Sequence, residues 1–107
     1  MKIITMREAA GRKFKTSGTL MVVIGQSPQK ALTVQDMRLR NKILDKIDAA
    51  IASGVENPTL TLEDAEHLHL RDAIMSFPWA MFDREILQIL EDIDGAETKE
   101  TLSVVRG

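Results

Sequence analysis

The sequence has 107 residues, no cysteine and a formal net charge of −2 at pH 7. The missing cysteine excludes disulfides and thiolate metal sites, and a chain of this length can bury a core of its own. No apolar run approaches the roughly 18 residues of a membrane-spanning helix. Because the first residues also lack the pattern of a secretory signal, we expect a cytoplasmic protein without membrane contact.

The first 32 residues are expected to form a β-rich or irregular segment. The run "MKIITMR" at 1–7 is short and β-branched, which indicates a strand. The apolar run "TLMVVIG" at 19–25 also favours a strand, which would pair with residues 2–6. A short helix in the second run is the alternative. Pro28 then interrupts regular structure and marks a linker.

A long amphipathic helix is predicted next. Thr33 is a good N-cap, Asp36 stands three residues later as in a capping box, and Gly54 is a natural C-terminal stop. The apolar residues recur at helical spacing and form a stripe expected to face the core: Met37, Leu44, Ile47 and Ile51, widened by Leu39 and Ile43.

Two shorter helices are predicted after it. Thr61 is expected to cap a helix over 62–75, and Pro78 favours the start of another over 79–93, which Asp94–Gly95 ends. The residues expected to be buried by these helices are Leu62, Ala65, Leu68 and Met75, with Leu70, Ile74 and Phe77 beside them, then Phe82, Ile86, Ile89, Leu90 and Ile93.

These elements predict an α+β fold that is mostly helical. A short N-terminal β-hairpin or extended segment (1–32) would pack on three amphipathic helices (33–95), followed by a tail (96–107) that is either frayed or a last strand. The length indicates one domain over 1–107.

The stretch "EDAEHLHLRDA" at 63–73 contains both histidines. On a helix, His67 and His69 would lie about 200° apart and could not bind the same ion. Glu63, His67 and Arg71 would instead form a surface ladder at i, i+4 spacing. In a strand the two histidines would share a face, but the cap and the apolar spacing favour a helix. We therefore expect a solvated face and no metal.

Sequence motifs of catalysis are missing. There is no phosphate-binding loop, no G-x-G-x-x-G and no G-x-S-x-G turn, and Asp92 and Asp94 do not fit a calcium loop. We expect neither catalytic residues nor a cofactor, so the chain is predicted not to be an enzyme.

Charge is divided between the halves of the chain. Residues 1–50 carry a net charge of +6 and residues 51–107 a net charge of −8. The two halves could pack on each other or meet head-to-tail between copies, and a basic face for nucleic acid is the alternative. The residues that would contact nucleic acid are Arg12, Lys13, Lys15, Arg38, Arg40 and Lys42, with Phe14 available for stacking.

The segment "SFPWAMF" at 76–82 holds the only tryptophan and two of the three phenylalanines. It could be core between two helices. Trp79 and Met81 cannot both share the Phe82–Ile86–Ile89 stripe, so the segment could also anchor a protein partner. The candidate interface residues are Phe77, Trp79, Met81 and Phe82.

Three stretches resemble small proteins encoded by phages and prophages: "LTVQDMRLRNKILDKI" (32–47), "LTLEDAEHLHLRDAI" (60–74) and "REILQILEDI" (84–93). The resemblance implies an accessory or virion-assembly role, located in the host cytoplasm or the virion, and it carries over no catalytic residue. The expected function is therefore a non-enzymatic interaction or assembly protein that self-associates or binds a partner protein. The alternative is a small nucleic-acid-binding regulator.

Overall fold

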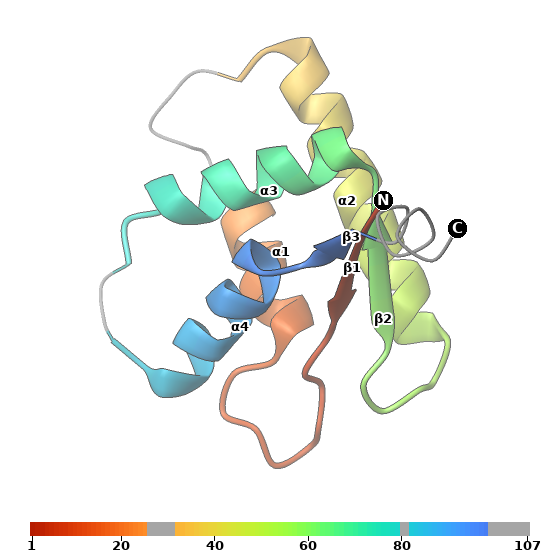
Figure 1. Ribbon diagram of the computed structural model, residues 1–107, viewed down its shortest axis with the longest axis vertical. Helices are drawn as coiled ribbons and strands as arrows, with labels where there is room; N and C mark the ends of the chain where they lie inside the picture. The colour runs from red at the N-terminus through yellow and green to blue at the C-terminus, as the bar shows by residue number, and fades with distance from the viewer. Residues whose placement is uncertain (26–31, 80–81, 99–107) are drawn as a thin grey trace.

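The computed structural model of the chain describes residues 1–25, 32–79 and 82–98, which form four helices and three strands (Figure 1). The expected mostly helical α+β fold is confirmed, with one more helix than the sequence predicted. The elements in chain order are β1 (Lys2–Thr5), α1 (Thr16–Gly25), α2 (Val34–Ala52), β2 (Thr59–Leu62), α3 (Asp64–Ser76), α4 (Arg84–Asp94) and β3 (Glu97–Thr98).

The sheet has the order β2-β1-β3, and β1 is antiparallel to both neighbours. Lys2 pairs with Leu62 and Thr5 with Thr59, whereas β3 pairs only with Lys2 and Ile3. The expected pairing of residues 2–6 with 19–25 is wrong. The partner strand, Thr59–Leu62, includes Thr61, which the sequence predicted as a helix cap.

Residues 16–25 form a helix that buries one side of their continuous apolar run. Leu20, Val23 and Ile24 are buried at i, i+3 and i+4, which puts them on one side of α1. The first turn is held by side chains, since the Thr16 hydroxyl accepts from the Arg7 amide at 2.8 Å and Glu8 accepts from the amide of Ser17. A carboxylate at this end also suits the helix dipole.

Helix α2 begins and ends as its caps predicted. Thr33 and Asp36 form the capping box, and Gly54 after the helix has a positive φ of 76°. Its buried face differs from the expected stripe. Ile43, Ile47 and Arg40 are buried, while Met37 and Ile51 are exposed.

Helix α3 begins later than expected, because Thr61 belongs to β2 and the N-cap is Glu63. The face that α3 buries is also rotated. Its inner residues are Glu66, His67, Leu70 and Ile74, and the expected core residues Leu68 and Met75 are 55% and 62% exposed.

Helix α4 begins five residues after the predicted start, at Arg84, because Asp83 is its N-cap and accepts from the Glu85 amide at 2.8 Å. Pro78 is therefore not the first residue of a helix. Ile86, Ile89 and Ile93 are buried as expected, but Phe82 precedes the helix and is 76% exposed.

One hydrophobic core joins β1, β2 and the four helices. Helix α3 crosses the molecule and packs on α1, α2 and α4, and α2 lies against β2 (Figure 1). Ion pairs also join the two oppositely charged halves of the chain. This agrees with the expectation that the two halves pack on each other. These pairs are Arg7–Asp92, Arg12–Glu85, Lys13–Asp83 and Lys46–Glu66.

Candidate functional site

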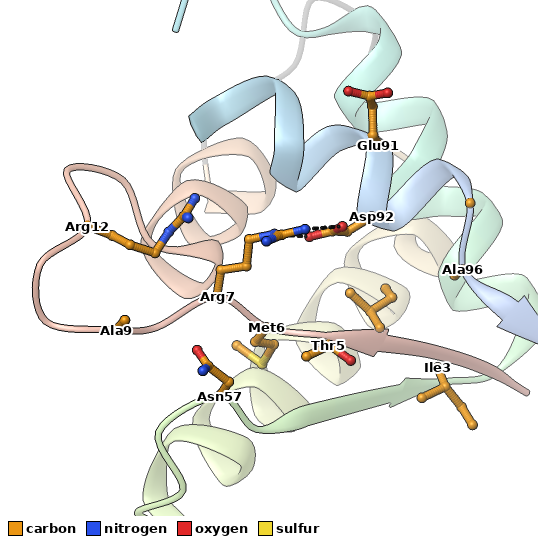
Figure 2. A pocket seen from close by; sticks show the side chains of 12 residues that line it. Ile3, Thr5, Met6, Arg7, Ala9, Arg12, Asn57, Glu91, Asp92 and Ala96 are labelled. Carbon is orange, nitrogen blue, oxygen red and sulfur yellow. Dashed lines mark hydrogen bonds and ion pairs between the residues drawn. The ribbon is translucent and has the colours of Figure 1, made fainter. Parts of the chain in front are cut away.

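A pocket of about 670 Å³ opens beside β1, between the loop that follows this strand and the C-terminal end of α4 (Figure 2). Its polar lining consists of Thr5, Arg7, Arg12, Asn57, Glu91 and Asp92. Because the lining carries both signs of charge, the pocket favours neither an anion nor a cation.

The Arg7 guanidinium in this pocket is bound to Asp92. Its Nε donates at 2.6 Å to one carboxylate oxygen and its Nη2 at 3.0 Å to the other, as Figure 2 shows. The pKa of Arg7 is raised, because Asp92 accepts these hydrogen bonds and carries the opposite charge. This two-point contact fastens the loop after β1 to α4.

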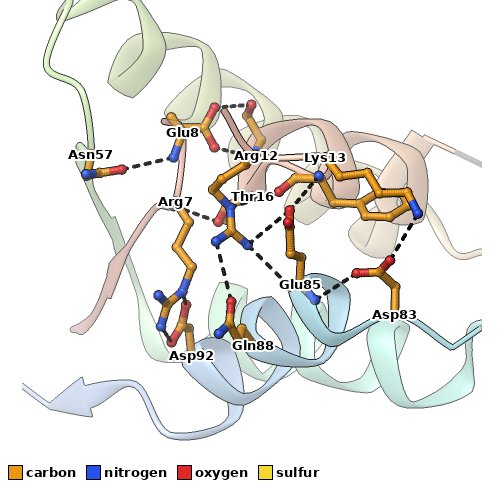
Figure 3. A network of polar contacts seen from close by, with 12 residues as sticks. Arg7, Glu8, Arg12, Lys13, Thr16, Asn57, Asp83, Glu85, Gln88 and Asp92 are labelled. Carbon is orange, nitrogen blue, oxygen red and sulfur yellow. Dashed lines mark hydrogen bonds and ion pairs between the residues drawn. The ribbon is translucent and has the colours of Figure 1, made fainter. Parts of the chain in front are cut away.

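Arg12 and Phe14, which the sequence offered to nucleic acid, are bound to α4 instead (Figure 3). The Arg12 guanidinium donates to the carbonyl of Phe14 at 3.0 Å and to the carbonyl of Glu85 and the side chain of Gln88 at longer range. The Phe14 amide donates to the Glu85 carboxylate at 2.9 Å. These contacts hold the loop closed against the helix.

Lys13 and Lys15, which the sequence also offered to nucleic acid, differ in their contacts. Both side chains are exposed, and the Nζ of Lys13 lies 3.4 Å from the Asp83 carboxylate. The pKa of Asp83 is lowered, chiefly because it accepts from the Glu85 amide and also because of Lys13. Lys13 therefore supports the cap of α4.

Of the three cations on α2 that the sequence offered to nucleic acid, two are exposed and one is buried. Arg38 and Lys42 are exposed, but Arg40 is 8% exposed. Arg40 donates from Nη1 to the carbonyl of Ile24 at 2.9 Å, which joins α2 to the end of α1. Arg40 stands three and seven residues before Ile43 and Ile47, and this spacing was the sequence signal for its burial.

The histidines lie on different sides of α3, as the helical expectation required. The expected solvated face is wrong, because both imidazoles make contacts inside the fold. The Nε2 of His67 lies 2.7 Å from the carbonyl of Ile93. The expected ladder is also wrong, since Arg71 pairs with Asp94 and Glu63 caps the helix.

His69 lies between two charged residues of α2. Its Nε2 accepts from Arg40 Nε at 3.1 Å, and its Nδ1 is 3.8 Å from the Asp36 carboxylate. The pKa of His69 is lowered, mainly by burial and then by the positive charge of Arg40. The imidazole is therefore neutral at pH 7 and accepts a hydrogen bond from the guanidinium.

Glu66 is a carboxylate that the sequence gave no reason to bury. It is 3% exposed, binds Lys46 through one oxygen and accepts from the Glu63 amide at 2.9 Å. Among the described residues, no group of three or more acidic, histidine or cysteine side chains could hold a metal ion. Within the same residues, no helix is long and apolar enough to span a membrane.

The aromatic segment is partly core and partly surface. Phe77 and Trp79 are half-buried against the core with ring centroids 4.6 Å apart, and Trp79 Nε1 donates to the carbonyl of Ile74 at 3.1 Å. Phe82 is exposed, and Met81 lies outside the described residues. Of the three predicted interface residues that the structure describes, Phe82 is thus the most exposed.

Comparisons with models of protein families, with curated proteins and with solved structures found no match to this chain.

Proposed function

We propose that this chain is a non-enzymatic interaction or assembly protein that binds a partner protein through a surface centred on Phe82. The observation that carries the proposal is the 76% exposure of this phenylalanine. An exposed aromatic ring of this size is costly in water, and aromatic side chains dominate the energy of protein interfaces.

The ends of the segment that carries Phe82 are held by the fold. On one side, Trp79 is fixed by its hydrogen bond to Ile74 and its contact with Phe77. On the other side, Asp83 caps α4 and pairs with Lys13. Because Phe82 directly precedes this cap, its backbone should lose less conformational freedom on binding than that of a residue in a loose chain.

On the resemblance of the helices to small phage proteins, we propose an accessory or virion-assembly role. The partner would then be another assembly protein. The nucleic-acid alternative has less support. Arg12 is bound to α4, Lys13 is exposed but paired with Asp83, and Arg40 is buried, which leaves Lys15, Arg38 and Lys42 as the exposed residues of the predicted set that have no ion pair with another described residue.

The test replaces Phe82 with a photo-crosslinking phenylalanine in the native host cell. Val55, which is 60% exposed in the turn after α2, receives the same crosslinker as a matched control. We expect a protein adduct from position 82 that is missing from position 55. Phe82→Ser should lose this partner while its free energy of unfolding stays within about 0.5 kcal/mol of the wild type. Equal adducts at both positions, or a serine variant that keeps the partner, would refute the proposal.

A further inference from the structure

Helix α2 presents an outer face that nothing in the described chain covers. The outer face of α2 consists of these exposed residues: Val34, Met37, Arg38, Asn41, Lys42, Asp45, Asp48, Ala49 and Ala52. They follow the side of the helix opposite its buried residues Ile43 and Ile47 over all 19 residues of α2, about 28 Å.

Charge on the outer face of α2 changes sign along the helix. The cations Arg38 and Lys42 lie in the first half, and the anions Asp45 and Asp48 lie in the second half. None of these four side chains has an ion pair or hydrogen bond with another described residue. The cationic and anionic pairs are centred about 10 Å apart along the helix axis.

We propose that the outer face of α2 binds the same face of a second copy of this chain, with the two helices antiparallel. A two-fold axis beside residue 43 puts Arg38 of each copy level with Asp48 of the other, and Lys42 one residue, about 1.5 Å along the axis, from level with Asp45. The interface then contains four ion pairs between copies. The symmetry makes one patch serve both partners, as in other two-fold dimers.

The apolar residues of the outer face fit the same register. Val34 lies level with Ala52 of the second copy, and Met37 lies level with Ala49. Val34 and Met37 are 63% and 55% exposed in the single chain. Large side chains at one end of the helix therefore meet small ones at the other, which allows close contact along both ends of the pair.

A parallel pair is unfavourable, because it puts Arg38 beside Arg38 and Asp45 beside Asp45. Charged residues beside a helix seam select helix orientation in this way. One helix pair buries less than the roughly 800 Å² per partner of a standard interface, so the dimer is weak and depends on concentration and salt.

The test uses two double charge reversals, Arg38→Glu with Lys42→Glu, and Asp45→Lys with Asp48→Lys. Each reversal leaves the outer face of α2 with a single sign of charge. All four substituted side chains are exposed, so the variants should fold. Far-ultraviolet circular dichroism checks this.

Sedimentation velocity over a concentration series measures the dimer. We expect the wild type to dimerise, each reversed variant to dimerise at least tenfold more weakly, and an equimolar mixture of the two to recover the dimer. A control variant with Lys15→Glu and Arg84→Glu changes charge equally at exposed residues outside α2, and it should dimerise like the wild type.

Three results would each overturn the proposal: a monomeric wild type at millimolar concentration, no recovery in the mixture, or an equal loss in the control. The proposal does not rest on Phe82, and Phe82→Ser should therefore keep the dimer. If that variant abolishes the dimer while the α2 reversals do not, the copies meet through the Phe82 surface and not through α2.

Discussion

Replacing Arg40 with alanine should lower the free energy of unfolding by about 3 kcal/mol. Arg40 is 8% exposed and donates to the carbonyl of Ile24 at 2.9 Å and to His69 Nε2 at 3.1 Å. The truncation removes the donor from both acceptors. Each acceptor left without a partner inside the fold costs about 1 to 3 kcal/mol, and the lost packing of the arginine stem adds to this.

Urea unfolding followed by fluorescence measures the change, because Trp79 is the only tryptophan. With a slope of about 1 to 3 kcal/mol per molar urea, the midpoint should fall by about 1 to 3 M. Arg38→Ala is the matched control, since Arg38 is an exposed arginine of the same helix, and it should change stability by less than about 0.5 kcal/mol.

Arg40→Lys provides a second check of the same reasoning. Lysine keeps the charge but lacks the planar fork that reaches two acceptors at once, so its stability should lie between those of wild type and Arg40→Ala. If Arg40→Ala is no less stable than Arg38→Ala, the two hydrogen bonds do not stabilise the fold and the reasoning fails.

Two further predictions concern pH and glycine. Because the pKa of His69 is lowered in the folded protein, the unfolded chain binds its proton first as the pH falls below about 6.5, so stability should decrease from pH 7.5 to 5. His69→Gln should remove part of this decrease in urea titrations at the two pH values, and an unchanged pH dependence would contradict the assignment. Gly18→Ala should raise stability by about 0.5 to 1 kcal/mol because its Cβ meets open space in α1. Gly54→Ala should lower stability by about 1 to 2 kcal/mol because of its φ of 76°, and melting temperatures that move the same way for both would refute this account.

The helix ends that depend on local chemistry could be predicted from the sequence. Thr33 and Asp36 cap each other within one turn, and Gly95 ends α4 as expected. These interactions involve residues three or four positions apart, so the sequence contains the whole interaction. The mostly helical fold follows from the same local signals.

The first strand was predicted within residues 1–7, but its partner could not be predicted, because the paired strands are distant in the chain. Residues 19–25 and 59–62 are both short runs rich in strand formers, and periodicity alone cannot decide between them. The choice depends on which run reaches β1. In the fold, 59–62 pairs with β1, and 16–25 becomes a helix whose first turn is bound by Arg7 and Glu8.

The rotation of α3 also depends on contacts with residues distant in the chain. It explains why apolar side chains of this helix are exposed. An apolar stripe predicts that Leu68 and Met75 face the core, yet Glu66 and His67 take that side because Lys46 and the Ile93 carbonyl satisfy them there. A helix has one inner face, so burying these polar residues turns the apolar ones toward water.

Arg40 has the same effect on α2. It occupies the inner face of the helix and leaves Met37 outside, in the patch proposed to bind a second copy. The polar contacts inside the fold and the apolar residues on its surface are thus two consequences of one helix rotation. Arg40→Leu is therefore a poor test of the α2 dimer, since it changes the rotation of the helix and the outer face together. Reversals confined to exposed charges avoid this coupling.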